Sequence, residues 1–170
     1  MLYATGMKRV LGIDPGLQIT GYGLVVAGDG ESEPDLVEAG VIRLEASKSV
    51  EYRVAQLHDD LTGIIKALLP DCVVVETLYS HYRHPRTAIL MAHARGVILL
   101  VAQQHHVRLE HLAATEVKKA VCGNGHASKD QVQRAIQTQY RLAEPPSPPD
   151  VADAIAIALT HARRLAGVTA

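Results

Sequence analysis

Short apolar runs alternate along the chain with longer stretches in which apolar residues recur every three or four positions. Apolar runs of about 4–8 residues between turn residues are typical of buried strands, whereas the longer period is typical of helices. The pattern predicts five strands, over residues 10–14, 20–27, 36–44, 72–76 and 107–111. It predicts five helices, over residues 49–69, 86–105, 115–121 and 128–140 and from residue 149 or 150 onward.

The order of these elements predicts the fold class. Three strands joined by short connections form an antiparallel meander, and later strands that alternate with helices are typical of a parallel arrangement. We therefore expect an α/β protein with a mixed five-stranded sheet, three antiparallel strands and then parallel ones, flanked by helices on both faces. We expect a single domain over residues 7–166, preceded by a disordered or upstream-start extension over residues 1–6.

The predicted helix over residues 86–105 is apolar on almost every side. A helix of this kind is usually buried on two sides. Ala88, Ala92 and Gly96 recur every four residues and would let another helix approach closely. That second helix could belong to the same chain or to a second copy in a dimer.

Four acidic residues lie at the ends of predicted strands or at the beginning of the last helix. Asp14 ends the first strand, and Glu76 ends the fourth. Asp150 and Asp153 are three residues apart, so they share one helix face. Asp14 could cap its own turn and Asp150 could serve the helix N-terminus, but capping does not explain Asp153 among its apolar neighbours. Burying carboxylates without a partner is costly, so convergence on a cation is the better explanation for the set.

Carboxylates without histidine or cysteine partners suit hard cations, Mg²⁺ or Mn²⁺ rather than zinc. Two such ions about 3.5–4 Å apart activate a water and stabilise the leaving oxygen in phosphodiester hydrolysis. The sequence therefore predicts four residues that are both catalytic and metal-binding: Asp14, Glu76, Asp150 and Asp153.

The net charge of −1 by itself argues against a nucleic-acid partner, but the charges are segregated. Residues 29–60 contain nine acidic and three basic side chains, whereas residues 79–134 contain eight basic and three acidic ones. Such a chain can present one positive face despite a total near zero. Two solvated surfaces of opposite sign would also explain the segregation. With the acids in view, we expect the basic residues to hold a phosphate backbone.

Two further features bear on the compartment. From the sequence we expect no apolar stretch long enough to span a bilayer, and we find no signal-peptide pattern at its beginning. Cys72 and Cys122 stand alone, without zinc-type spacing, and we expect both to be reduced thiols. These features predict a cytoplasmic protein without a membrane partner.

Several short motifs occur in order: Leu-Gly-Ile-Asp-Pro-Gly from residue 11, Thr-Gly-Tyr-Gly from residue 20, Val-Glu-Thr-Leu-Tyr from residue 75, Ala-Arg-Gly from residue 94, Val-Lys from residue 117, glycines at 123 and 125, Ser-Lys at 128 with Gln-Val at 131, and Asp-Val-Ala-Asp-Ala-Ile-Ala from residue 150. By this ordered set, residues 7–165 resemble the RuvC family of crossover (Holliday) junction endodeoxyribonucleases, which have the ribonuclease H-like fold. The chain departs from the family in a histidine-rich loop after Tyr79 and in Ala92-His93, where Gly-Gln is more frequent.

The resemblance implies a homodimer that binds a four-way DNA junction and resolves it by paired symmetric nicks, in homologous recombination and DNA repair. It implies two metal ions, Mg²⁺ or Mn²⁺, and the RuvA–RuvB branch-migration complex as partner. The family's catalytic acids match the four acids above, although some members carry a histidine in place of Asp150. An aromatic residue that engages bases at the junction centre matches Tyr79. The candidate DNA-binding residues are Tyr79, Arg83, Arg86, Lys118, Lys119 and Lys129.

Three alternatives come from other functional classes. A nuclease of the same superfamily could act on RNA or on RNA–DNA hybrids. A nucleotide-binding domain of the actin and sugar-kinase type also places an acid before a Gly-rich hairpin, but such proteins need two domains and 170 residues supply one. A non-catalytic junction-binding module is the third, and the presence of all four acids gives no reason for it.

The long helix beginning at Arg86 is our candidate for the dimer interface.

Overall fold

The computed structural model describes residues 7–28, 33–77 and 85–167, so the expected extension over residues 1–6 lies outside them. Every predicted element is present, with boundaries that differ by no more than two residues. The strands are β1 (Lys8–Asp14), β2 (Ile19–Ala27), β3 (Asp35–Arg43), β4 (Cys72–Glu76) and β5 (Arg108–Leu112). The helices are α1 (Val50–Leu68), α2 (Pro85–Gln104), α3 (Ala114–Cys122), α4 (Lys129–Gln139) and α5 (Pro149–Ala166).

The strands form one five-stranded sheet in the order β3-β2-β1-β4-β5. β1, β2 and β3 pair antiparallel, whereas β4 pairs parallel with both β1 and β5. The expected mixed sheet is therefore confirmed. β1 lies at its centre and joins the antiparallel part to the parallel part.

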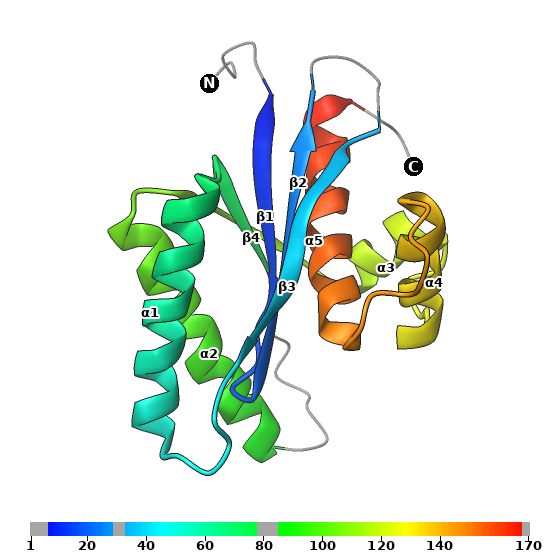
Figure 1. Ribbon diagram of the computed structural model, residues 1–170. Helices are drawn as coiled ribbons and strands as arrows, with labels where there is room; N and C mark the ends of the chain where they lie inside the picture. The colour runs from blue at the N-terminus through cyan, green and yellow to red at the C-terminus, as the bar shows by residue number, and fades with distance from the viewer. Residues whose placement is uncertain (1–6, 29–32, 78–84, 168–170) are drawn as a thin grey trace.

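Helices cover both faces of this sheet (Figure 1). α1 and α2 lie on one face, whereas α5 crosses the other face with α3 and α4 beyond it. Side chains of a strand alternate between the two faces. Val10 of β1 accordingly packs in the apolar cluster under α5, and Leu11 and Ile13 pack in the cluster under α1 and α2.

Glycines bring α5 unusually close to the sheet. A Cβ on Gly12 of β1 would lie 2.6 Å from the backbone nitrogen of Ala158, and a Cβ on Gly21 of β2 would collide with the backbone carbonyl of Asp150. Glycine within a strand is typical of a bulge or of close approach by another backbone or a ligand, and here it is the backbone of α5 that approaches. The first turn of α5 therefore lies directly on the backbone of β2, and the following turns lie on the backbone of β1.

Within the described chain, α2 is buried on one side, and burial of its second side would need a partner molecule. Its buried side chains, Ala94, Ile98, Val101 and Ala102, pack toward the sheet and α1, whereas Ile89 and Leu100 are exposed. A Cβ added at Gly96 would meet nothing within 4 Å, so no helix of the described chain uses this position for close packing. One apolar face of α2 is left open to solvent.

The hydropathy of α2 corrects the expectation that no stretch of the chain could span a bilayer. Residues 86–104 of α2 are long and apolar enough by length and composition, and 22% of this stretch is buried within the protein. The hydropathy has a different explanation in this fold: the helix combines a core-facing side with an exposed apolar side. An exposed apolar side of this kind is also typical of a surface that another protein covers.

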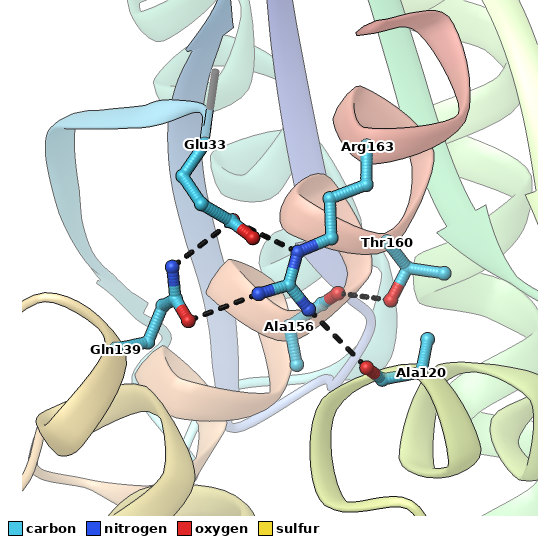
Figure 2. Close-up of polar contacts among 6 residues, drawn as sticks. All are labelled: Glu33, Ala120, Gln139, Ala156, Thr160 and Arg163. Atoms are coloured by element: carbon cyan, nitrogen blue, oxygen red, sulfur yellow. Dashed lines mark hydrogen bonds and ion pairs between the residues drawn. The ribbon is translucent and has the colours of Figure 1, made fainter. Parts of the chain in front are cut away.

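An arginine of α5 holds the three helices of its face together (Figure 2). Arg163 Nε donates to Glu33 Oε2 at 3.0 Å, and Nη2 donates to Gln139 Oε1 at 2.9 Å. Its Nη1 donates to the backbone carbonyl of Ala120 at 3.2 Å. Because Gln139 also donates to Glu33 at 3.0 Å, the network links α3, α4, α5 and the chain before β3.

Candidate active site

Asp14 and Glu76 lie next to each other because their strands are parallel neighbours. Ile13 of β1 pairs with Val75 of β4, and each acid is the next residue of its strand. The carboxyl ends of parallel strands meet at the same edge of a sheet, where side chains are free to form a site. The strand register therefore brings two of the four predicted acids to one place.

Thr20 closes the turn that follows Asp14. Its Oγ1 donates to the carbonyl of Gly16 at 2.6 Å and accepts from the Gly16 N–H at 3.3 Å. Across residues 7–28, 33–77 and 85–167, the Asp14 carboxylate makes no such hydrogen bond. Turn capping is therefore not the role of Asp14, and its carboxylate is available to the site.

The other two acids come from the beginning of α5. This helix begins at Pro149 after Pro148, which offers no capping side chain, and Asp150 lies in the first turn. Asp153 follows one turn later on the same face. The contact between Gly21 and the Asp150 backbone places this turn over the end of β1 and the beginning of β2.

The electrostatics indicate how closely the acids converge on Asp14. Burial, together with the charges of Asp153, Glu76 and Asp150, raises the pKa of Asp14 from 3.8 to about 8. Lys129 acts in the opposite direction. All three predicted partners of Asp14 therefore act on it directly.

Glu76 and Asp153 share this environment. Burial raises the pKa of Glu76, with a further contribution from Asp153, whereas Lys118 and Lys129 lower it. Burial also raises the pKa of Asp153, against the effects of Lys129 and Lys118 and with that of Asp150. A set of buried acids that oppose one another's ionisation is typical of functional sites.

Lys129 reaches the acids from the first residue of α4. Ser128 caps this helix, accepting from the Gln131 N–H at 3.2 Å while Gln131 Oε1 accepts from the Ser128 N–H at 2.8 Å. This capping box fixes the direction of the first turn. The Lys129 Nζ then lies 3.3 Å from Asp153 Oδ2. Burial lowers the pKa of Lys129, but Asp153 and Asp14 outweigh that effect and raise it, so the ammonium stays charged.

The remaining candidates fall into two groups. Lys118 of α3 lowers the pKa of Glu76 and Asp153, whereas Lys119 and Arg86 are not among the charges that shift the pKa of Asp14, Glu76 or Asp153. Tyr79 and Arg83 lie within residues 78–84, outside the described residues. The structure therefore brings two of the predicted basic residues, Lys118 and Lys129, to the acids.

A cleft of about 410 Å³ opens beside the acids. Asp14, Asp150 and Lys129 line one side, and Thr87, Leu90 and Met91 of α2 line the other together with the β1–β2 turn. This volume lies within the range of about 300–1,000 Å³ that ligand sites occupy. The cleft gives a substrate access to Asp14 between α2 and α5.

The donor set is made of carboxylate oxygens, which fits Mg²⁺ or Mn²⁺ rather than zinc. Within residues 7–28, 33–77 and 85–167, however, no three His, Cys, Asp or Glu side chains are already gathered closely enough to hold one ion. The Asp153 carboxylate lies beside Lys129 instead. The residue types suit a metal, and small side-chain movements would be needed to gather them around it.

Sequence reasoning did not assign a role to Arg95. Its Nε donates to the carbonyl of Glu76 at 3.2 Å, and its Nη2 lies 2.9 Å from His111 Nδ1. A charged residue in an otherwise apolar stretch of α2 was the available signal. That signal does not reveal a contact with a backbone atom of another element.

Comparisons with known proteins agree with this geometry. The family model for the crossover junction endodeoxyribonuclease RuvC matches residues 10–161. The chain is 47% identical over 150 residues to the RuvC of Rhodopirellula baltica, which covers 88% of this chain and 83% of that protein. It is 38% identical over 153 residues to the RuvC of Caldicellulosiruptor saccharolyticus, covering 90% of this chain and 91% of that protein.

Solved structures extend the comparison to three dimensions. Thermus thermophilus RuvC in complex with a Holliday junction substrate superimposes with a TM-score of 0.84 at 32% identity, covering 94% of this chain and 96% of that one. The yeast mitochondrial Holliday junction resolvase shares the fold, with a TM-score of 0.68 at 16% identity, covering 96% of this chain and 80% of that one. The chain therefore belongs to the RuvC family of crossover junction endodeoxyribonucleases, with their ribonuclease H-like fold.

Proposed function

We propose that this endonuclease resolves four-way DNA junctions by hydrolysing one phosphodiester bond in each of two strands of like polarity, at the acids of β1, β4 and α5. The mutual effect of these buried carboxylates on Asp14 is the observation that carries the proposal. The proposed catalytic and metal-binding residues are Asp14, Glu76, Asp150 and Asp153.

We infer that the site takes Mg²⁺, with Mn²⁺ able to substitute, and two ions in each active site. Bound together, two such ions supply an activated water and stabilise the departing oxygen of the cleaved phosphodiester. The raised pKa of Asp14 supports this inference, because clustered acids ionise together readily only beside a cation. Asp14 would then change from a protonated to an ionised side chain as the site fills.

Lys118 and Lys129 are proposed to hold phosphates beside the cleaved bond. Both carry charge next to the acids, where an incoming phosphodiester would otherwise meet only negative side chains. Phosphate contacts of this kind position the DNA without reading its sequence. From the family resemblance we add four further DNA contacts, at Tyr79, Arg83, Arg86 and Lys119.

We propose a homodimer whose interface is formed by α2. Ile89 and Leu100 are exposed on this helix, and the open position at Gly96 would let a partner helix approach closely. A two-fold dimer matches the two-fold symmetry of a four-way junction and places one active site on each of two strands. The exposed apolar side of α2 would then be covered by its symmetry mate.

The family resemblance carries three further proposals about the setting of this activity. The protein would work with the RuvA–RuvB branch-migration complex in recombination and repair. It would do so in the cytoplasm. Its nuclease domain would span residues 7–166.

Cleavage of a synthetic four-way junction beside a linear duplex and an RNA–DNA hybrid, in Mg²⁺ and then in Mn²⁺, tests the proposal. We expect paired symmetric nicks in the junction. Asp14→Asn should cleave the junction at least about 100-fold more slowly than the wild type while still binding it. Asp59→Asn is the matched control, because Asp59 is an exposed acid on α1, and it should cleave like the wild type.

Three results would contradict the proposal. Cleavage of the hybrid with an intact junction would indicate a related nuclease that acts on RNA–DNA hybrids. Junction binding without cleavage in either metal would indicate a non-catalytic binding module. An Asp14→Asn variant with full activity would remove Asp14 from the catalytic set.

A further inference from the structure

The carboxyl end of β4 is where the chain must hold Glu76 in place. β1 ends one residue beyond its last pairing with β4, so the carbonyl of Glu76 lies past the β1–β4 ladder. On the other side, the Thr77 N–H still donates to the carbonyl of Leu112 at 2.8 Å. The backbone around Glu76 is therefore fixed by β5 on one side and needs a partner from elsewhere on the other.

Arg95 of α2 is that partner. Its Nε donates to the carbonyl of Glu76 at 3.2 Å. Arginine has five N–H donors in a planar fork, so one side chain can bind two acceptors in fixed directions. The second acceptor is His111 on β5, whose Nδ1 lies 2.9 Å from Arg95 Nη2.

His111 fixes the orientation of the fork. An arginine can only donate, so the imidazole Nδ1 must accept and the ring is neutral in this contact. Burial and the charge of Arg95 both lower the pKa of His111, in agreement with a neutral ring. The Arg95 side chain thus extends from α2 and binds the sheet at two points, one on β4 and one on β5.

We propose that Arg95 is a positioning residue for Glu76: by anchoring the carboxyl end of β4 to α2 and β5, it sets where the Glu76 carboxylate meets the other acids. This inference rests on the proposed role of Glu76 in catalysis. It does not make Arg95 a catalytic residue, because its contact is with the Glu76 backbone. The anchor also connects Glu76 to the helix that carries the exposed apolar face.

The variants are Arg95→Met, which keeps much of the apolar stem and removes every donor, and Arg95→Lys, which keeps the charge and one donor group. His111→Phe removes only the second acceptor. Arg108→Met is the matched control. Arg108 is the first residue of β5 and hydrogen-bonds Glu110 at 2.7 Å. It lies at the end of β5 away from His111 and Leu112, which flank the Arg95 contact.

Amide hydrogen exchange at Thr77 in the metal-free protein is the first measurement. We expect Arg95→Met to speed exchange of this amide by about tenfold or more, with a smaller increase for His111→Phe and no change for Arg108→Met. The second measurement is the Mg²⁺ concentration for half-maximal thermal stabilisation without DNA. Arg95→Met should raise it about 10- to 100-fold, the usual effect of losing a group that orients a metal ligand, and Arg95→Lys should recover part of the loss.

The junction assay completes the design. For Arg95→Met we expect a lower kcat, with the Kd for the junction in the absence of metal unchanged. Wild-type Thr77 exchange together with a wild-type Mg²⁺ midpoint in Arg95→Met would overturn the proposal. Loss of junction binding alone would also overturn it, because Arg95 would then be a DNA contact.

Two design features keep the outcomes separable. If the wild type does not cleave junctions, the proposed function fails, while the exchange and Mg²⁺ measurements still decide the role of Arg95. If Arg95→Met does not fold, the comparison of Arg95→Lys and His111→Phe with Arg108→Met decides it by the same two measurements.

Discussion

The Lys129 ammonium lies 3.3 Å from the Asp153 carboxylate, between the first turn of α4 and the second turn of α5. Because the lysine side chain is 62% exposed, solvent screens this ion pair and it adds little to the free energy of unfolding. Its consequence is local. The charge offsets part of the repulsion among acids that burial has already made difficult to ionise.

Lys129→Met should therefore change metal binding and DNA binding in opposite directions. Without DNA, the Mg²⁺ concentration for half-maximal thermal stabilisation is expected to fall near pH 8, because a competing cation has been removed. The affinity for a four-way junction should fall, and the slope of log affinity against log salt should decrease by about 1. Calorimetry and binding titrations at several salt concentrations measure both effects.

Lys119→Met is the comparison for the metal titration, since Lys119 is not among the charges that shift the pKa of Asp14, Glu76 or Asp153. Its Mg²⁺ midpoint should equal that of the wild type. A Lys129→Met variant that needs more Mg²⁺ would show that the lysine helps to arrange the carboxylates rather than competing with the cation.

The raised pKa of Asp14 predicts how stability depends on pH. In the folded, metal-free protein this pKa is about 8, whereas in the unfolded chain it is near its ordinary 3.8. Between these values the folded state holds a proton that the unfolded state has released, so the free energy of unfolding falls as pH rises. Asp14→Asn should remove that contribution. In the presence of a chelator, the variant is expected to be more stable than the wild type near pH 8 and equal to it near pH 4.

Thermal unfolding across this pH range measures the difference. Asp59→Asn, an exposed acid on α1, should follow the wild-type curve. Adding Mg²⁺ should narrow the gap between wild type and Asp14→Asn, because the cation favours the ionised acids. Parallel curves for wild type and Asp14→Asn would mean that Asp14 has an ordinary pKa.

Gly12→Ala should destabilise the protein and displace the acids of α5. The added Cβ would lie 2.6 Å from the backbone nitrogen of Ala158 and would also collide with the carbonyl of Ala154, and neither atom can move without the helix. Overpacking of this kind costs about 1–3 kcal/mol. Denaturant unfolding measures the loss of stability, and junction cleavage should fall with it.

Gly63→Ala is the control for this prediction. Gly63 lies within α1 and a Cβ there meets nothing within 4 Å. Alanine in that position should raise the free energy of unfolding by about 0.5–1 kcal/mol. Equal effects of the two substitutions would mean that α5 can retreat from the sheet without loss.

Arg163→Met should lower the free energy of unfolding by about 1.5–3 kcal/mol, because Glu33 and Gln139 lose their charged partner. The arginine side chain is only 13% exposed, so water replaces these hydrogen bonds poorly. Arg164→Met is the neighbouring control. Its ion pair with Glu116 is half exposed, and its loss should cost under about 1 kcal/mol. Equal losses for the two arginines would contradict the structural role of the Figure 2 network.

The sequence pattern was sufficient for most of the fold because the local signals agree with the tertiary structure. Of the two serines that could begin the first helix, Ser47 and Ser49, it is Ser49 that caps it; Ser128 caps α4, and the short β-branched run from Cys72 is a buried strand. α2 is the exception. Hydropathy reports how apolar a helix is, but not whether its second apolar side faces the same chain, another chain or solvent.

The candidate site could be predicted as far as residue type and position at the end of an element. Asp14 and Glu76 meet because β1 and β4 are parallel, which follows from the alternation of strands and helices. The difference between Lys118 and Lys119 depends on the rotation of α3 about its axis, which neighbouring residues in a sequence do not reveal. Arg95 acts on a backbone carbonyl, and no residue type marks such an acceptor.

The glycines under α5 have a consequence for how this enzyme can vary. Where α1 and α2 meet the sheet, side chains lie on both sides of the contact, so volume lost on one side can be recovered on the other over generations. Beneath the first turns of α5, the sheet contributes bare backbone at Gly12 and Gly21 and has no side chain to exchange. The side chains under α1 and α2 can therefore be exchanged for others, whereas any side chain at Gly12 or Gly21 would move α5, and Asp150 and Asp153 with it, away from the sheet.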